Sequence, residues 1–406
     1  MSAAELLAVR HPGALADLLR EANAARRGLL VTSGEDALPA LPGDEGRLGL
    51  SLAPLHGIVH HDPGDEVIGV EPGVLLDDLA DRVARDGQRL AIEAPRGLGF
   101  TVGGAVAAGL EGFVGARYGA LREQILGLAA TLPDGRVSRA GGRVVKNVTG
   151  YDLVRLHCGA AGQFGVLHEI TLRLRPLPRG RRTLVFSRGD ATEAFALARR
   201  LRDLDHRLSG LAVAGGAAVA AGAGPWLVAL RVEGSGTSLE DAESRGAAEG
   251  PYDALEGADE SELWDALTRG PWVAPFRLSV RSRPSRLGPL ADDVLRAAAT
   301  TGADEDEEVP GEPGLVADLF RPGFDLFGRR PAADLDAWLA ASGIPARLAA
   351  AEARGSLPSE PDDRPRRAAR FGAPPLARAR LEDRLKRAFD PAGILGAGRW
   401  WREVSP

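Results

Sequence analysis

The chain has 406 residues and a formal net charge of −6, with 56 acidic and 50 basic side chains. This length allows two domains with sizeable cores, and the acidic balance argues against a nucleic-acid-binding protein, which normally carries a basic excess on one face. The one cysteine, Cys158, excludes an internal disulfide and fits a reducing compartment.

The N-terminal stretch, residues 1–28, mixes acids and arginines with apolar residues and has no apolar core of a signal peptide. We expect an amphipathic helix here and a cytoplasmic location. Further along, His56, His60 and His61 have a spacing that suggests a metal, but no spaced carboxylate or cysteine accompanies them. A surface histidine cluster is the favoured interpretation, and we predict no metal site.

The segment Leu98–Leu110 (LGFTVGGAVAAGL) is small and apolar, and Gly103-Gly104 opens an Ala-rich helix. The N–H groups and the dipole at such a helix start suit a diphosphate. On the residues alone, close packing of a buried helix is the favoured explanation of these glycines. Thirteen residues are too few to span a bilayer.

The segment Gly141–Pro176 contains a glycine-rich crossover between a short helix and a strand. An extended run at 143–147 is broken at 148–150, and residues 151–157 predict about two helical turns. Gly159, Gly162 and Gly165 allow backbone to lie against a ligand or a neighbouring strand. The alternation of Val166–Arg175 predicts a half-buried strand that ends at the prolines following it.

The second half alternates helices and strands, which is typical of an α+β domain. Helices are predicted over 191–203, 239–248, 259–268, 286–300 and 377–389, and a strand over 276–281. Residues 208–230 carry no charge, but their Ala and Gly content favours two strands and a turn over a transmembrane segment. Mobile loops are predicted near 301–314 and 355–375, which have few large apolar residues.

Four motifs in order resemble a known family: residues 70–95 (VEPGVLL…), 100–109 (FTVGGAVAAG), 117–137 (RYGALRE…) and 144–176 (VVKNVTGYD…). They are similar to the FAD-binding domain of the vanillyl-alcohol oxidase and p-cresol methylhydroxylase (PCMH-type) family, and most similar to the smaller FAD-binding subunits of bacterial glycolate oxidases. The ending at 385–400, LKRAFDPAGILGAGRW, also resembles this family.

The resemblance implies an α+β fold: a two-subdomain PCMH-type FAD-binding domain at 1–180, a smaller α+β cap at 181–385, and a C-terminal segment at 386–406 that returns to the FAD domain. It also implies non-covalent FAD, because no His or Cys falls at a matching site. The residues expected at the cofactor are Ser33, Gly34, Thr101, Val102, Gly103, Gly104, Ala105, Gly109, Tyr118, Gly119, Lys146, Gly162, Gly165 and Val166.

One loop departs from the family pattern. Relatives carry a glycine-rich loop of the RGGGT type, whereas this chain has Ser33-Gly34 followed by Glu35 and Asp36. Carboxylates beside a diphosphate would repel it unless they point to solvent. The departure predicts weaker FAD binding within the same fold.

The resemblance implies an oxidoreductase subunit that passes a hydride from a small 2-hydroxy acid, such as glycolate, to flavin N5. Partner flavin and iron–sulfur subunits are expected, with peripheral association at the inner membrane through them. Arg277 and Arg281 alternate along one predicted strand and are candidates for the substrate carboxylate, although a solvent face explains them equally well.

No catalytic residue is identified. All seven histidines lie within the first 206 residues, so the cap contains only His206 and has no evident base over the flavin. A non-catalytic accessory subunit with weak or no FAD binding is the alternative, and an oxidoreductase acting on an alcohol or a sugar is a third possibility.

Overall fold

The computed structural model describes residues 6–34, 46–143, 152–204, 208–219, 224–274, 276–281, 283–300, 313–320, 323–328, 349–355, 366–370 and 376–395. Internal contacts divide the chain into two compact units, one of residues 1–112, 119–177 and 374–406 and the other of residues 113–118 and 178–373. The predicted functional boundaries at 180 and 385 stay predictions.

The first unit contains a small parallel sheet with strand order β1 (Leu6–Ala8), β3 (Leu48–Ser51) and β2 (Leu29–Thr32). Helix α1 (Pro12–Ala24) supplies Leu15, Leu19 and Ala22 to the core of this part. The helix begins where the His11 ring accepts a hydrogen bond from the Ala14 N–H, with proline at its first position. The predicted N-terminal helix is therefore confirmed.

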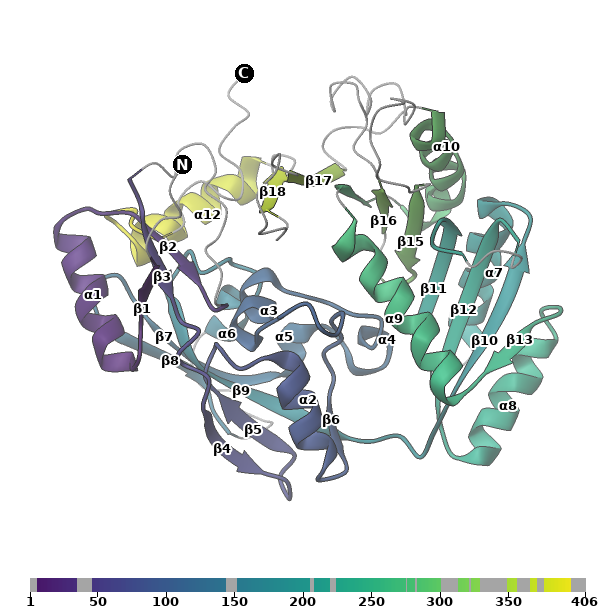
Figure 1. Ribbon diagram of the computed structural model, residues 1–406, viewed down its shortest axis with the longest axis horizontal. Coiled ribbons are helices and arrows are strands. Elements are labelled where there is room, and N and C mark those ends of the chain that lie inside the picture. The colour runs from purple at the N-terminus through teal and green to yellow at the C-terminus, as the bar shows by residue number, and fades with distance from the viewer. Residues whose placement is uncertain are drawn as a thin grey trace. The chain divides into compact units, whose positions relative to one another are not determined.

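A larger antiparallel sheet completes the first unit (Figure 1). Its strand order is β4 (Ile58–Asp62), β5 (Val67–Val70), β9 (Val166–Pro176), β7 (Ile125–Thr131) and β8 (Val137–Gly141), and β6 (Gln88–Leu90) pairs with the end of β9. Strand β9 was predicted to be half-buried, but most of its residues on both faces are buried. The reason is its position between β5 and β7, which the alternation of its own residues does not reveal.

The first unit has further helices, of which α12 is the longest. They are α2 (Leu76–Ala84), α3 (Val102–Ala108), α5 (Leu121–Gln124), α6 (Leu153–His157) and the C-terminal α12 (Leu376–Phe389). After α12 the chain forms an isolated parallel bridge between Leu395 and Leu29 of β2. Ile394 and Leu395 are buried in the same cluster as Leu15 and Leu19, so the residues that follow α12 up to 395 are part of this core.

The second unit is built on a nine-stranded antiparallel sheet. Its strand order is β13 (Asp253–Leu255), β10 (Gly180–Arg188), β12 (Trp226–Gly234), β11 (Leu208–Gly216), β15 (Gly314–Asp318), β16 (Gly323–Gly328), β14 (Phe276–Arg281), β17 (Ala349–Gly355) and β18 (Arg366–Arg370). The uncharged stretch at 208–230 forms an antiparallel pair, as predicted. No helix in the part of the chain that the structure describes is long and apolar enough to cross a membrane.

Helices cover the sheet of the second unit on both faces. Phe195 of α7 (Ala191–Leu204), Leu239 of α8 (Gly236–Ala247) and Leu287 of α10 (Leu287–Thr300) share one core cluster. Trp264 and Leu267 of α9 (Gly257–Val273) belong to a second cluster, formed with residues of alternate register on the same strands. Helix α9 was predicted to end at residue 268 but continues through Pro271.

One predicted loop is wrong in part. The segment 355–375 was expected to be a mobile loop, yet Arg366–Arg370 forms strand β18 and pairs with β17. The prediction rested on amino-acid composition, which describes side chains. Strand β18 forms because its backbone hydrogen-bonds to the backbone of β17, and composition does not show this. Of the other predicted loop, 301–314, residues 301–312 lie outside the described residues.

Candidate functional site

Two hydroxyl groups from distant parts of the chain meet at the start of α3. Thr101 caps this helix by accepting a hydrogen bond from the Gly104 N–H at 3.1 Å. Its Oγ1 lies 2.6 Å from the Oγ of Ser33, which follows β2 and is 68 positions away in sequence. Gly34 is held beside them, because its carbonyl accepts from the Ser51 hydroxyl. The structure therefore brings together the two expected halves of the cofactor site, the Ser33-Gly34 turn and the VGG helix start.

The first amides of α3 are already satisfied within the protein. The N–H groups of Val102 and Gly103 donate to the carbonyls of Val74 and Pro72, each at 2.8 Å, and the Ala105 N–H donates to the Thr101 carbonyl. The predicted set of exposed amides for a diphosphate is therefore not what this helix start presents. What it offers instead is the Ser33–Thr101 hydroxyl pair beside backbone that has no side chains.

Gly103 is required by packing. A Cβ there would lie 2.6 Å from the Pro72 Cβ and 2.9 Å from its carbonyl oxygen. At Gly104 the closest atoms are the hydroxyl oxygens themselves, Thr101 Oγ1 at 3.0 Å and Ser33 Oγ at 3.4 Å. A side chain at Gly104 would thus crowd the hydroxyl pair directly. Val102 and Ala105 are buried in the core.

The glycine crossover packs on the other end of α3. The N–H groups of Gly159 and Ala161 donate to the carbonyls of Val106 and Ala107 at 2.9 and 2.8 Å. Helix α3 ends at Gly109, which has φ +62° and whose missing Cβ would lie 3.1 Å from the Gly159 Cα. Backbone hydrogen bonds therefore hold α3 and the glycine crossover together, although the two segments are far apart in sequence.

The end of the crossover enters the sheet. Gly162 has φ +72°, with open space where a Cβ would be, apart from the Gly165 carbonyl at 4.0 Å. The Gly165 backbone lies against β7, and the Val166 side chain is buried in the same cluster as Ile394 and Leu395. A Cβ at Gly162 would thus meet no close neighbour, and Val166 is a core residue.

Tyr118, Gly119 and Lys146 are the other residues expected at the cofactor. Tyr118 belongs by its contacts to the second unit, where its hydroxyl donates to the buried carboxylate of Glu233 at 2.9 Å. Gly119 has φ +83°, and a Cβ there would clash with the Glu123 carboxylate. Lys146, and the acids Glu35 and Asp36, lie outside the described residues.

A buried histidine lies directly before the crossover. His157 ends α6 with a side chain about 1% exposed, and burial lowers its pKa to about 4. Among the described residues, neither ring nitrogen has a hydrogen-bond partner. Burial also raises the pKa of the neighbouring Cys158 thiol to about 11, so this sulfur is protonated and a poor nucleophile. Sequence reasoning missed His157, because a histidine inside an apolar run has no distinguishing spacing.

The predicted absence of a metal site concerns His56, His60 and His61. Within the described ranges no group of three or more His, Cys, Asp or Glu side chains is arranged to hold a metal ion. The His61 ring instead lies 3.8 Å from the Asp86 carboxylate.

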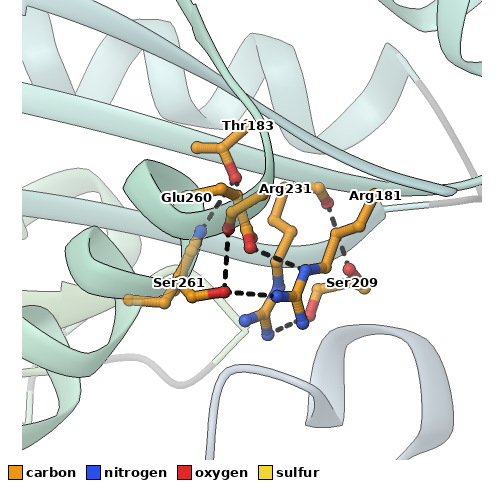
Figure 2. A network of polar contacts seen from close by, with 8 residues as sticks. Arg181, Thr183, Ser209, Arg231, Glu260 and Ser261 are labelled. Atoms are coloured by element: carbon orange, nitrogen blue, oxygen red, sulfur yellow. Dashed lines mark hydrogen bonds and ion pairs between the residues drawn. The ribbon is translucent and has the colours of Figure 1, made fainter.

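A buried polar network lies on the α9 face of the second unit (Figure 2). The Glu260 carboxylate pairs with Arg181 at 2.6 Å and accepts from the Thr183 hydroxyl, which in turn accepts from the Trp264 indole N–H at 2.8 Å. Beside it, the Arg231 guanidinium stacks 4.3 Å from the Trp264 ring. Arg231 and Glu260 are about 2% and 1% exposed, whereas Arg181 is partly exposed, and the network fixes α9 on the sheet.

The predicted arginine pair lies on β14. Arg277 donates to the Asp325 carboxylate at 3.0 Å and stacks 4.4 Å from the Trp272 ring, and Ser279 donates to the same carboxylate. The backbone of Arg281 is in the strand, while its side chain lies outside the described set. Asp325 already offsets the charge of Arg277, so a carboxylate ligand would have to share that guanidinium with it.

Comparison with known proteins identifies the first part of the chain. Residues 3–141 match the FAD_binding_4 family, described as an FAD binding domain. This part of the chain is similar to FAD-binding domains. The match ends just before the crossover, which the structure joins to α3.

Curated relatives match part of the chain, and one of them is named for FAD. An uncharacterized FAD-linked oxidoreductase of Mycobacterium tuberculosis is 36% identical over 168 residues, covering 41% of this chain and 36% of that protein. Glycolate oxidase subunit GlcE of Escherichia coli is 41% identical over 124 residues, covering 30% of this chain and 35% of GlcE. A D-lactate dehydrogenase of Anaerostipes hadrus is 34% identical over 32% of this chain and 27% of that enzyme. The aligned part thus spans about a third of these relatives.

The fold extends over more of the chain than these matches do. The solved structure of p-cresol methylhydroxylase with substrate bound has a TM-score of 0.71 at 14% identity, covering 97% of this chain and 88% of that one. The predicted α+β architecture of the PCMH type is confirmed.

The residues present fit FAD in their donor chemistry. Ser33 and Thr101 provide neutral hydroxyl groups. Gly104, beside these hydroxyls, and Gly162, in the crossover, provide backbone without side chains. A diphosphate and a ribityl chain can be held by such donors without a counter-charge. The individual contacts with the cofactor stay predictions.

Proposed function

We propose that the protein is an FAD-dependent oxidoreductase that takes a hydride from a small 2-hydroxy acid. The observation that carries this proposal is the FAD-binding domain at 3–141, in which the Ser33–Thr101 hydroxyl pair forms beside the VGG turn. The names of relatives, a glycolate oxidase subunit and a D-lactate dehydrogenase, support the substrate class.

The residues of this chain would act mainly by binding and orientation. FAD, when bound, supplies the electron-pair acceptor at N5. One hydroxyl of the Ser33–Thr101 pair donates to the other, so the pair would donate one hydrogen bond to a diphosphate or ribityl oxygen, and the Gly162 backbone would lie against the cofactor. Arg277 would orient the substrate carboxylate through the guanidinium edge that Asp325 leaves available, with Trp272 holding the guanidinium plane.

We further propose that the protein works in the cytoplasm as one subunit of a glycolate oxidase-type complex. The similarity to glycolate oxidase subunits of Escherichia coli and Bacillus subtilis supports this assembly. Partner flavin and iron–sulfur subunits would receive the electrons, and they would bring the complex to the inner membrane peripherally.

The test begins with the absorbance spectrum of the purified protein. We expect flavin bands in the blue and near ultraviolet, at up to one FAD per chain after incubation with FAD. Thr101→Val should lower FAD occupancy, whereas Thr101→Ser, which keeps the hydroxyl, should retain most of it. A wild-type protein that stays colourless with excess FAD would refute the flavoprotein proposal.

Substrate is tested by anaerobic bleaching of the bound flavin. Glycolate and D-lactate are added to the protein alone and to the protein with its co-purified partners. Bleaching of the isolated protein shows an autonomous enzyme, and bleaching only with partners shows a subunit that depends on them. No bleaching in either case contradicts the 2-hydroxy-acid proposal. Arg277→Met should raise the substrate concentration needed for half-maximal bleaching, while FAD occupancy stays unchanged.

A further inference from the structure

The ammonium group of Lys386, on α12, is surrounded by three acceptors. It donates to the Asp390 carboxylate at 2.7 Å, to the Gln163 carbonyl at 2.8 Å and to the Leu395 carbonyl at 2.5 Å. A lysine ammonium has three N–H donors, so these contacts use all of them. The side chain is only about 16% exposed. Lys386 is therefore committed to a fixed internal position.

Two of the three acceptors belong to the C-terminal segment itself. The Asp390 carboxylate is about 2% exposed and also accepts from the N–H groups of Ile394 and Leu395, at 3.0 and 2.8 Å. The Ile394 carbonyl accepts from the Leu29 N–H at 2.7 Å, which ties this turn to β2. The third acceptor, Gln163, is the one that comes from elsewhere in the chain, and it lies in the glycine crossover.

The crossover is consequently held at both ends. Its beginning is bound to α3 through Gly159 and Ala161. Its end is bound to α12 through the Gln163 carbonyl, and the Phe164 ring packs 5.8 Å from the Phe389 ring. Gly162, in the left-handed region at φ +72°, lies between the two attachments. Only the second attachment depends on a side chain that can be replaced without altering the loop.

We propose that Lys386 is a positioning residue for FAD: through the Gln163 carbonyl it holds the crossover in its FAD-binding conformation and makes residues 386–395 part of the cofactor site. This inference rests on the proposed flavin function. Lys386 acts on the loop and does not touch the cofactor. Its loss leaves the Gln163 carbonyl without its charged donor and frees the loop on one side.

Two variants separate the effect on the loop from a general loss of stability. Lys386→Met keeps an apolar stem of similar length but leaves the Asp390 carboxylate buried without its cation. Lys386→Met combined with Asp390→Asn removes that unpaired charge as well. The matched control is Leu19→Ala, which opens a cavity in the cluster that holds Ile394 and Leu395 but keeps Lys386 and its hydrogen bond to the Gln163 carbonyl.

The first measurement is hydrogen–deuterium exchange of the FAD-free protein. Both Lys386 variants should exchange the amides of residues 159–165 at least tenfold faster than wild type, while Leu19→Ala leaves them within twofold. The second is the FAD dissociation constant from flavin fluorescence, which should rise at least tenfold in both Lys386 variants. It should rise less in Leu19→Ala when the variants are compared at equal urea midpoint.

Unchanged exchange at 159–165 in both Lys386 variants would overturn the proposal. So would an equal loss of FAD affinity in Leu19→Ala at equal stability. If wild type itself binds no FAD, the proposed function fails, while the exchange measurement still decides whether Lys386 holds the crossover.

Discussion

His157 makes a sharp prediction about the pH dependence of stability. Its pKa is lowered from 6.5 to about 4 by burial, so the folded protein keeps this ring neutral while the unfolded chain protonates it. Between these two values the unfolded state binds more protons than the folded state. The free energy of unfolding must therefore fall as the pH is lowered from about 6.5 towards 4, and His157→Leu should remove this contribution.

The size of the effect follows from the same pKa values. Each unit of pKa is worth about 1.4 kcal/mol, so His157 contributes a loss of about 2 kcal/mol at pH 5 and about 3 kcal/mol once both states are protonated. Solvent screening takes little from this value, because the side chain is about 1% exposed. The ring also buries an N–H without a partner among the described residues, so His157→Leu should not destabilise the protein at pH 8.

Urea unfolding followed by circular dichroism at pH 8 and pH 5 measures both quantities. Wild type should lose about 2 kcal/mol more than His157→Leu between these pH values. His168, whose pKa burial also lowers, is present in both proteins and cancels in the comparison. Leu19→Ala serves as a control that is destabilised at both pH values without losing a titrating group. An identical pH dependence in wild type and His157→Leu would refute the assignment of a neutral, desolvated ring.

Three further changes test the packing. Thr101→Val should lower the free energy of unfolding by about 1 kcal/mol through loss of the α3 cap, as the urea midpoint will show, with no loss in Thr101→Ser. Gly109→Ala should cost about 1–2 kcal/mol for its φ of +62° alone, and an unchanged thermal midpoint would contradict the close approach to the crossover. Glu260→Gln should cost about 2–3 kcal/mol, less than a fully buried pair because Arg181 is partly exposed, whereas the exposed Glu262→Gln should leave unfolding unchanged.

Local sequence patterns predicted most helices and strands, but they predicted few of the elements that pair or pack with one another. The strand at 276–281 and the helices near 191–204 and 287–300 follow from periodicity and from breaks in composition, which are properties of short segments. The continuation of α9 through Pro271 and the pairing of β18 were missed, because each is decided by tertiary packing. The buried charges Arg231 and Glu260 could not be distinguished from surface residues, since their network joins strands and a helix far apart in sequence.

The candidate site shows a related limit, which concerns the glycines. Gly103 and Gly109 were expected at the cofactor, yet a Cβ at Gly103 would collide with Pro72, and a Cβ at Gly109 would lie 3.1 Å from the Gly159 Cα. A glycine required by packing and a glycine required by a ligand look identical in a sequence. Replacing Gly103 or Gly109 would therefore disturb α3, so a loss of FAD binding in such a variant would not locate the cofactor.

Gly104 and Gly162 are the positions that can discriminate. The atoms nearest to a Cβ at Gly104 are the Thr101 and Ser33 hydroxyl oxygens, and a Cβ at Gly162 meets open space. A bulky residue at Gly104 should reduce flavin content by displacing this hydroxyl pair while the rest of the core stays packed. Full FAD occupancy in a folded Gly104→Leu protein would place the cofactor away from the VGG turn. The crossover held by Lys386 would then be the remaining candidate for the FAD contact.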